Sequence, residues 1–188
     1  MTAVSPGVKL TYDDFLRFPD DGMRHELIDG EHYVTPAPNI KHQQVVLNLA
    51  VAMSNFLERR PLGKLFIAPL DVVFTQFDIV EPDLLYVSKE RATAILTSKH
   101  VRGVPELVVE VGSPSTRKRD ETKKRALYER VGVNEYWFAD PDHDVVRVYR
   151  RDGRTFSAPV ELSRERRDVL RTPLLPTLKI ALARVFQE

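Results

Sequence analysis

Short runs of apolar and β-branched residues recur along this chain and predict the strands of a sheet. The run ELVVEV at 106–111 is almost continuously apolar, which is typical of a strand buried on both faces. Asp29-Gly30 separates two short runs within 25–34, a pattern that favours a β-hairpin. Further extended segments are predicted at 65–74, 84–87, 135–140 and 145–150, with a weaker one at 154–162.

Helical periodicity marks several of the segments between these runs. Apolar residues recur every three or four positions over 40–59, which predicts a long amphipathic helix. A second helix is predicted over 117–131, where Gly132 provides a stop. Shorter helices are expected at 11–18 and 177–187, and 88–103 fits a helical turn followed by a loop.

The order of these elements predicts one α/β domain, a mixed sheet flanked by helices. A chain of 188 residues is long enough to bury a substantial core. Its sequence contains no repeat, low-complexity stretch or clear interdomain linker. We therefore expect an N-terminal tail at residues 1–10 and a single domain over 11–188.

Composition removes several kinds of chemistry. The absence of cysteine excludes disulfides, thiolate zinc sites and a cysteine nucleophile. Because 28 Lys and Arg residues nearly balance 27 Asp and Glu residues, attraction to phosphate must come from local clusters. The sequence shows neither a leader-like N-terminus nor an apolar run of about 18 residues, so a cytoplasmic location is expected.

Two acidic residues occupy positions that solubility alone does not explain. Asp83 precedes the apolar run 84–87, and Glu110 lies inside the run 106–111. A carboxylate in a buried strand costs several kcal/mol unless it is paired or binds a cation. If the two strands are antiparallel neighbours, the carboxylates converge, and oxygen ligands of this kind suit Mg²⁺ or Mn²⁺.

The helix predicted over 117–131 contributes a lysine to this picture. Leu127, Tyr128 and Val131 form an inward stripe, and the same stripe reaches Lys124 one turn earlier. Lys123 is rotated away by roughly 100° and is expected to face solvent. Two carboxylates, a divalent cation and a lysine are the parts needed for phosphodiester hydrolysis.

Plainer interpretations of these residues remain open. Asp83 after a proline also fits a turn. Glu110 could pair with a core arginine such as Arg147. Lys124 could form an i,i+4 pair with Asp120 on a solvated helix face. A lone histidine such as His42 is more often structural than catalytic, so we leave it outside the predicted catalytic set.

A basic cluster opens the same helix. Phosphate contact near a helix N-terminus is one interpretation, and a solvated face balanced by neighbouring acids is the other. On the first interpretation the residues that contact nucleic acid are Arg117, Lys118, Arg119 and Lys123.

An ordered set of segments resembles a large bacterial family of restriction-endonuclease-like proteins within the PD-(D/E)XK nuclease superfamily. These segments are HELIDGE, EPDLLYV, PELVVEVGSPST, RDETKKRALYERVGVNEYWFADP and VVRVYR. The resemblance spans roughly residues 12–150. It implies a restriction-endonuclease-like fold and a Mg²⁺-dependent nuclease site, with the signature Pro-Asp at Pro82-Asp83 and its second acid at Glu110. It also places an additional metal-proximal carboxylate at Glu26.

One position departs from the superfamily pattern. The signature lysine falls at 112, where this chain has Gly112. Either the site is silent or the amine comes from the neighbouring helix, a known variation, and the stripe argument favours Lys124. The predicted function is therefore a metal-dependent endonuclease acting on DNA, with Asp83, Glu110 and Lys124 as catalytic residues. Asp83, Glu110 and Glu26 are the expected metal ligands. A homodimer is plausible, because two active sites would permit cleavage of both DNA strands. The alternative function is a catalytically silent protein that binds nucleic acid or a protein partner.

Overall fold

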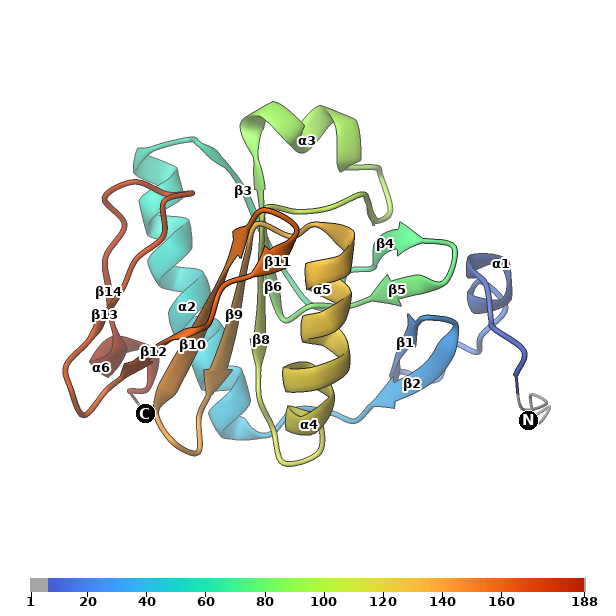
Figure 1. Ribbon diagram of the computed structural model, residues 1–188, viewed down its shortest axis with the longest axis horizontal. Coiled ribbons are helices and arrows are strands. Elements are labelled where there is room, and N and C mark those ends of the chain that lie inside the picture. The colour runs from blue at the N-terminus through green and yellow to red at the C-terminus, as the bar shows by residue number, and fades with distance from the viewer. Residues whose placement is uncertain (1–6, 188) are drawn as a thin grey trace.

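The computed structural model of the protein describes residues 7–187, and its centre is a seven-stranded mixed sheet (Figure 1). Strands β8 and β9 are parallel, and the other pairs are antiparallel. The strand order is β11-β10-β9-β8-β6-β3, with β12 paired to β10. The strands are β3 (Gly63–Ile67), β6 (Leu84–Ser88), β8 (Leu107–Val111), β9 (Glu135–Asp140), β10 (Val145–Asp152), β11 (Thr155–Phe156) and β12 (Val160–Ser163).

Helices cover both faces of this sheet. Helix α2 (Ile40–Arg59) packs on one face, together with the C-terminal helix α6 (Leu182–Val185) and the strand pair β13 (Val169–Leu170) and β14 (Ile180–Ala181) (Figure 1). The opposite face packs against a continuous helical segment made of α4 (Arg117–Arg119), the π-helical turn η1 (Asp120–Lys124) and α5 (Arg125–Val131). The sheet thus separates two hydrophobic cores.

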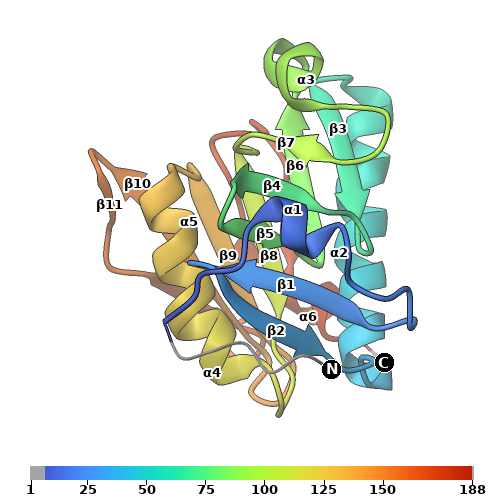
Figure 2. The same cartoon turned by 90° about the vertical axis from the view of Figure 1, so that its right-hand side faces the viewer.

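A second sheet lies beyond α5 and faces the viewer in Figure 2. Its order is β2-β1-β5-β4-β7, and β1 and β2 form the hairpin expected at Asp29-Gly30. Its strands are β1 (Arg24–Ile28), β2 (Glu31–Thr35), β4 (Val72–Thr75), β5 (Asp78–Val80) and β7 (Val101–Arg102). The short helices α1 (Tyr12–Phe15) and α3 (Lys89–Ile95) complete the described chain.

Strand pairing brings the two predicted carboxylate positions to the same place in the sheet. Strands β6 and β8 are antiparallel neighbours, with Leu84 opposite Val109. One step along this register, Asp83, which directly precedes β6, lies opposite Glu110. The prediction that these two strands are neighbours is confirmed, and so is the mixed α/β architecture with flanking helices.

Two predicted helices are shorter than the sequence pattern indicates. The helix expected at 177–187 is confined to α6, because Ile180 and Ala181 pair with β13 and Thr177 adopts a positive φ of 74°. The helix expected at 11–18 is confined to α1, which Thr11 caps through a reciprocal hydrogen-bond pair with Asp14. No described helix is both long and apolar enough to cross a membrane.

Candidate functional site

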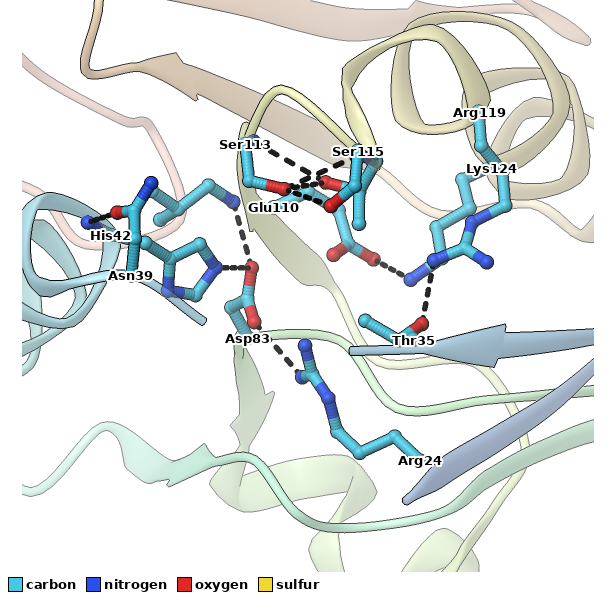
Figure 3. Close-up of polar contacts among 12 residues, drawn as sticks. Arg24, Thr35, Asn39, His42, Asp83, Glu110, Ser113, Ser115, Arg119 and Lys124 are labelled. Carbon is cyan, nitrogen blue, oxygen red and sulfur yellow. Dashed lines mark hydrogen bonds and ion pairs between the residues drawn. The ribbon is translucent and has the colours of Figure 1, made fainter. Parts of the chain in front are cut away.

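Asp83 is held where β6 begins, with both carboxylate oxygens bonded. Its Oδ2 accepts hydrogen bonds from the backbone N–H of Val111 at 2.9 Å and from His42 Nε2 at 3.0 Å (Figure 3). Its Oδ1 accepts one from Arg24 Nη1 at 3.1 Å. Burial opposes ionisation, but the hydrogen bond and charge of His42 and the charge of Arg24 outweigh it and hold the pKa of Asp83 below its usual value. Asp83 is therefore an ionised carboxylate within the site, which is more than a turn residue requires.

Glu110 projects from β8 toward the α4–α5 side of the sheet. Its Oε1 accepts hydrogen bonds from Lys124 Nζ at 3.0 Å and from the hydroxyl of Tyr128. Its Oε2 accepts no hydrogen bond from the described residues. The alternative partner Arg147 instead binds Glu121 and Glu161, so the pairing of Glu110 with Arg147 is wrong.

Lys124 lies between two carboxylates on the buried side of its helix. Its Nζ is 3.0 Å from Glu110 Oε1 and 2.7 Å from Glu26 Oε1, and the residue is only 3% exposed. Its neighbour Lys123 has a half-exposed side chain and pairs with Glu31 instead. Lys124 therefore lies on the buried side that the stripe of Leu127, Tyr128 and Val131 predicts, and the solvated-face interpretation is wrong.

Glu26 is buried in β1 and closes the site from the hairpin side. Besides Lys124, its carboxylate accepts from the backbone N–H of Glu81 and from Thr35 Oγ1, and it pairs with Arg119 at 3.4 Å. Burial opposes ionisation of Glu26, but Lys124 and Arg119 outweigh it and lower its pKa. Glu26 is thus a buried ionised group.

Asp120 is a fourth buried carboxyl near this group. It opens the π-helical turn that ends at Lys124, and its Oδ1 is buried with no hydrogen-bond partner in the described part of the chain. Burial raises the pKa of Asp120 to about 6, although the positive charge of Lys124 acts in the opposite direction. π-helical turns inside α-helices are frequent at functional sites.

Electrostatics at the centre disfavour a negative charge on Glu110. Burial raises the pKa of Glu110 to about 8; Lys124 lowers it in opposition, and Asp120 and Asp83 raise it further. Burial disfavours the ammonium of Lys124, but Glu110, Glu26 and Asp120 outweigh that effect and raise its pKa. Lys124 is therefore a permanent cation, and Glu110 is the carboxyl that a further cation would stabilise in its ionised form.

Gly112 is required by packing. A Cβ placed there would lie 2.7 Å from Phe138 Cζ, closer than real Cβ atoms approach a neighbour. The Gly112 N–H also bonds to the carbonyl of Ala139 at 2.8 Å, which fixes the backbone. No lysine fits at 112 while Phe138 keeps its place, so an amine can reach Glu110 only from another element.

The predicted basic cluster has mostly found partners within the protein. Arg117 binds Asp140 through two hydrogen bonds of 2.7 and 2.8 Å. Arg119 pairs with Glu26, and Lys123 pairs with Glu31. Lys118 is exposed and forms no ion pair with a described residue. Of the four residues, Lys118 has the charge most available to an external phosphate.

Two members of the site, Arg24 and His42, lie outside the predicted catalytic set. Arg24 and His42 both bond to Asp83, from β1 and from the first turn of α2. His42 is buried, and its Nδ1 has no partner among the described residues. The signal available for His42 was the N-cap Asn39, whose Oδ1 accepts from the His42 N–H and fixes that turn beside the sheet.

A cleft of about 410 Å³ opens beside Asp83. Arg24, His42 and Glu81 supply polar groups to its wall. Burial and Asp71 raise the pKa of Glu81 to about 7. The remaining lining is mainly small or apolar and includes Met23, Pro36, Ala37, Pro38, Val46, Ala68 and Pro69.

The site offers a donor set that suits a hard cation only in part. Asp83 and Glu110 provide carboxylate oxygens at adjacent strand positions, and Glu110 Oε2 has no hydrogen-bond partner among residues 7–187. Within the same residues, no group of three or more Asp, Glu or His side chains is arranged to hold a metal ion. A divalent cation would therefore depend on two protein carboxylates and on oxygens from water or substrate.

Comparison with known proteins identifies the fold and the family. A crystal structure described as "a putative nuclease belonging to DUF820 from Anabaena variabilis ATCC 29413" has a TM-score of 0.79 and 20% sequence identity, covering 94% of this chain and 97% of that chain. A search of curated proteins finds no match. The family model Uma2, described as "Putative restriction endonuclease", matches residues 12–183. Since that match spans most of the sequence, the chain belongs to the Uma2 family of restriction-endonuclease-like nucleases.

Proposed function

We propose that this protein is a metal-dependent endonuclease that hydrolyses phosphodiester bonds in DNA. One observation supports this most directly: the Lys124 ammonium lies between Glu26 and Glu110, beside the Asp83 position of the adjacent strand. Because position 112, directly after β8, leaves no room for a lysine, the helix supplies the amine that the chemistry needs. The family to which the chain belongs supports the same reaction class.

Each residue has a definite part in this proposal. Asp83 and Glu110 would hold one Mg²⁺ or Mn²⁺ ion, with Glu26 as a further carboxylate near it. The chemistry that such an ion would supply is polarisation of the phosphate and a lower pKa for a coordinated water. Lys124 donates hydrogen bonds to a phosphate oxygen or to the attacking water and stabilises negative charge as it develops. Lys118 contributes an exposed positive charge that attracts the backbone.

A catalytically silent nucleic-acid or protein binder is the second candidate. Its supporting observation is that Asp83, Glu26 and Glu110 already form ion pairs with Arg24 or Lys124 within the protein. Metal-dependent cleavage by the purified protein separates the two candidates.

The decisive experiment compares Lys124→Ala with Lys123→Ala. We expect Lys124→Ala to reduce cleavage of a labelled DNA with Mg²⁺ or Mn²⁺ by about 100-fold to 1000-fold, the usual cost of removing one electrostatic catalyst. Lys123→Ala should weaken DNA affinity only slightly and in a salt-dependent way.

Circular dichroism must accompany this assay. Removing one partner of a buried ion pair costs about 3–5 kcal/mol, so Lys124→Ala should melt earlier. Lys124→Met retains the volume and should lose cleavage with less loss of stability. Equal cleavage by the Lys123 and Lys124 variants would remove Lys124 from the catalytic set, and no cleavage by the wild type would favour the silent binder.

A further inference from the structure

The catalytic centre is almost closed to solvent. Asp83, Glu110 and Lys124 are each 3% exposed, and Glu26 is 1% exposed. The hairpin β1–β2 covers the centre from one side, and the first turn of α2 covers it from another (Figure 3). A phosphate on the outside of an intact duplex therefore cannot contact these residues in this conformation.

The cleft beside Asp83 gives access to the Asp83 side of this centre. It is lined by Asp83 itself and has a volume of about 410 Å³, within the range of about 300–1,000 Å³ common for small-molecule sites. Such a space accommodates a nucleotide but not a double helix. Met23, Val46 and Pro69 give it apolar walls, the surface on which an unstacked base is stabilised.

Two polar residues of the cleft, Arg24 and Glu81, are placed where they can contact the phosphate and the base of a nucleotide. Arg24 uses one guanidinium nitrogen on Asp83 and keeps its other N–H groups without a hydrogen-bond partner among the described residues. Its charge therefore lies where a phosphate must pass to reach Asp83. On the same wall, the carboxyl group of Glu81 accepts no hydrogen bond from the described residues. A carboxyl of this kind can accept from the amino group of a base.

We propose that this cleft binds an unpaired nucleotide, so that the substrate is single-stranded or locally unpaired nucleic acid. The proposal rests on the proposed nuclease function, because it places the scissile phosphate next to Asp83. An enzyme that acts inside a closed pocket must take a base out of the stack or begin with one already unpaired. Burial of the centre, the size of the cleft and its apolar walls all lead to the same occupant.

Binding without metal tests the proposal independently of catalysis. Fluorescence anisotropy in EDTA compares a short labelled single strand, its blunt duplex and the same duplex with an unpaired bulge. The single strand and the bulged duplex should bind at least about tenfold more tightly than the blunt duplex. Charge attraction alone gives the opposite order, because a duplex has the higher charge density.

Blocking the cleft provides the matched comparison. Val46→Trp should weaken single-strand binding by about tenfold or more, because the indole fills the cleft. Leu47→Trp is the control, since Leu47 is the adjacent residue on α2, is 55% exposed and does not line the cleft. Met23→Trp is a second blocking variant, at a wall position that is 48% exposed and lies outside the hydrophobic core. Melting curves check that each variant is folded.

The outcomes separate the two proposals. The cleft proposal would be overturned if blunt duplex and single strand bind equally well, or if no strand binds at all. It would also be overturned if both blocking variants bind the single strand as tightly as Leu47→Trp does. Absence of cleavage of every substrate with Mg²⁺ or Mn²⁺ would overturn the nuclease function alone. Efficient cleavage of blunt duplex would keep the nuclease and remove the unpaired-nucleotide specificity.

Discussion

Two buried glutamates on adjacent strands show how differently the fold uses the same residue. Glu135 begins β9 and is 1% exposed, and Glu110 in β8 is 3% exposed. Glu135 accepts hydrogen bonds from Trp137 Nε1 and Thr172 Oγ1, both at 2.7 Å, and from Arg150 at 3.4 Å, so both of its oxygens are bonded. Glu110 has one oxygen bonded and lies among other carboxyl groups.

Burial alone therefore does not distinguish a functional acid from a structural one. A buried carboxylate that is fully bonded to neutral donors and an arginine stabilises local packing. A buried carboxyl with a raised pKa, a lysine on one oxygen and no partner on the other has capacity for a ligand. This difference predicts opposite effects of the same substitution at the two positions.

The largest expected effect is on cleavage in Glu110→Gln compared with Glu135→Gln. Glu110→Gln should lower the cleavage rate by about 100-fold to 1000-fold while changing stability little, because burial already raises the pKa of Glu110 to about 8. Glu135→Gln should cleave normally but lose about 1–3 kcal/mol of stability. A glutamine amide has only one acceptor oxygen, whereas both carboxylate oxygens of Glu135 accept hydrogen bonds. Rate assays and urea unfolding measure both. Similar profiles for the two variants would contradict the distinction.

A smaller effect concerns the pH dependence of stability. Burial raises the pKa of Asp120 from 3.8 to about 6, so the folded state holds this proton more tightly than the unfolded chain. The resulting stability is present below about pH 3.8 and is lost as pH rises through about 6. Asp120→Asn removes this loss and should gain up to about 3 kcal/mol over the wild type between about pH 4 and pH 7.

Urea unfolding across this pH range measures the effect. Asp152→Asn, at the exposed end of β10, is the control and should follow the wild type throughout. A constant difference between Asp120→Asn and the wild type at all pH values would show that Asp120 ionises freely in the folded state.

The smallest effect is metal-dependent stabilisation. If Mn²⁺ binds as proposed, at ten times its dissociation constant it should stabilise the folded protein by about 1.4 kcal/mol and raise the melting temperature by about 3–6 °C for a chain of this size. Glu110→Gln should lose this rise, and Glu135→Gln should retain it from a lower starting point. An equal rise in the two variants would remove Glu110 from the metal site.

Much of the framework could be predicted because it depends on local patterns. Continuous apolar runs predicted β6, β8, β9 and β10, and Asp29-Gly30 predicted the β1–β2 hairpin. Strand β5 escaped prediction because its first residue, Asp78, is an acid that is buried only after Arg130 and the N–H of Asp29 bind it. The C-terminal helix was overestimated because pairing of Ile180 with Leu170 replaces its first part.

The residues of the candidate centre also fall into two groups, those that local patterns predict and those that only the tertiary structure brings together. Continuous apolar runs place Asp83 and Glu110 on the sheet, and the helical period places Lys124 on the buried helix face; both patterns depend only on nearby residues. Arg24 and His42 are 59 and 41 residues from Asp83, so no local pattern could join them. Only the tertiary structure decided that Phe138 excludes a lysine at Gly112 and that most of the basic cluster is neutralised internally. Ion pairs and close contacts form between elements that packing brings together, whereas periodicity acts within each element.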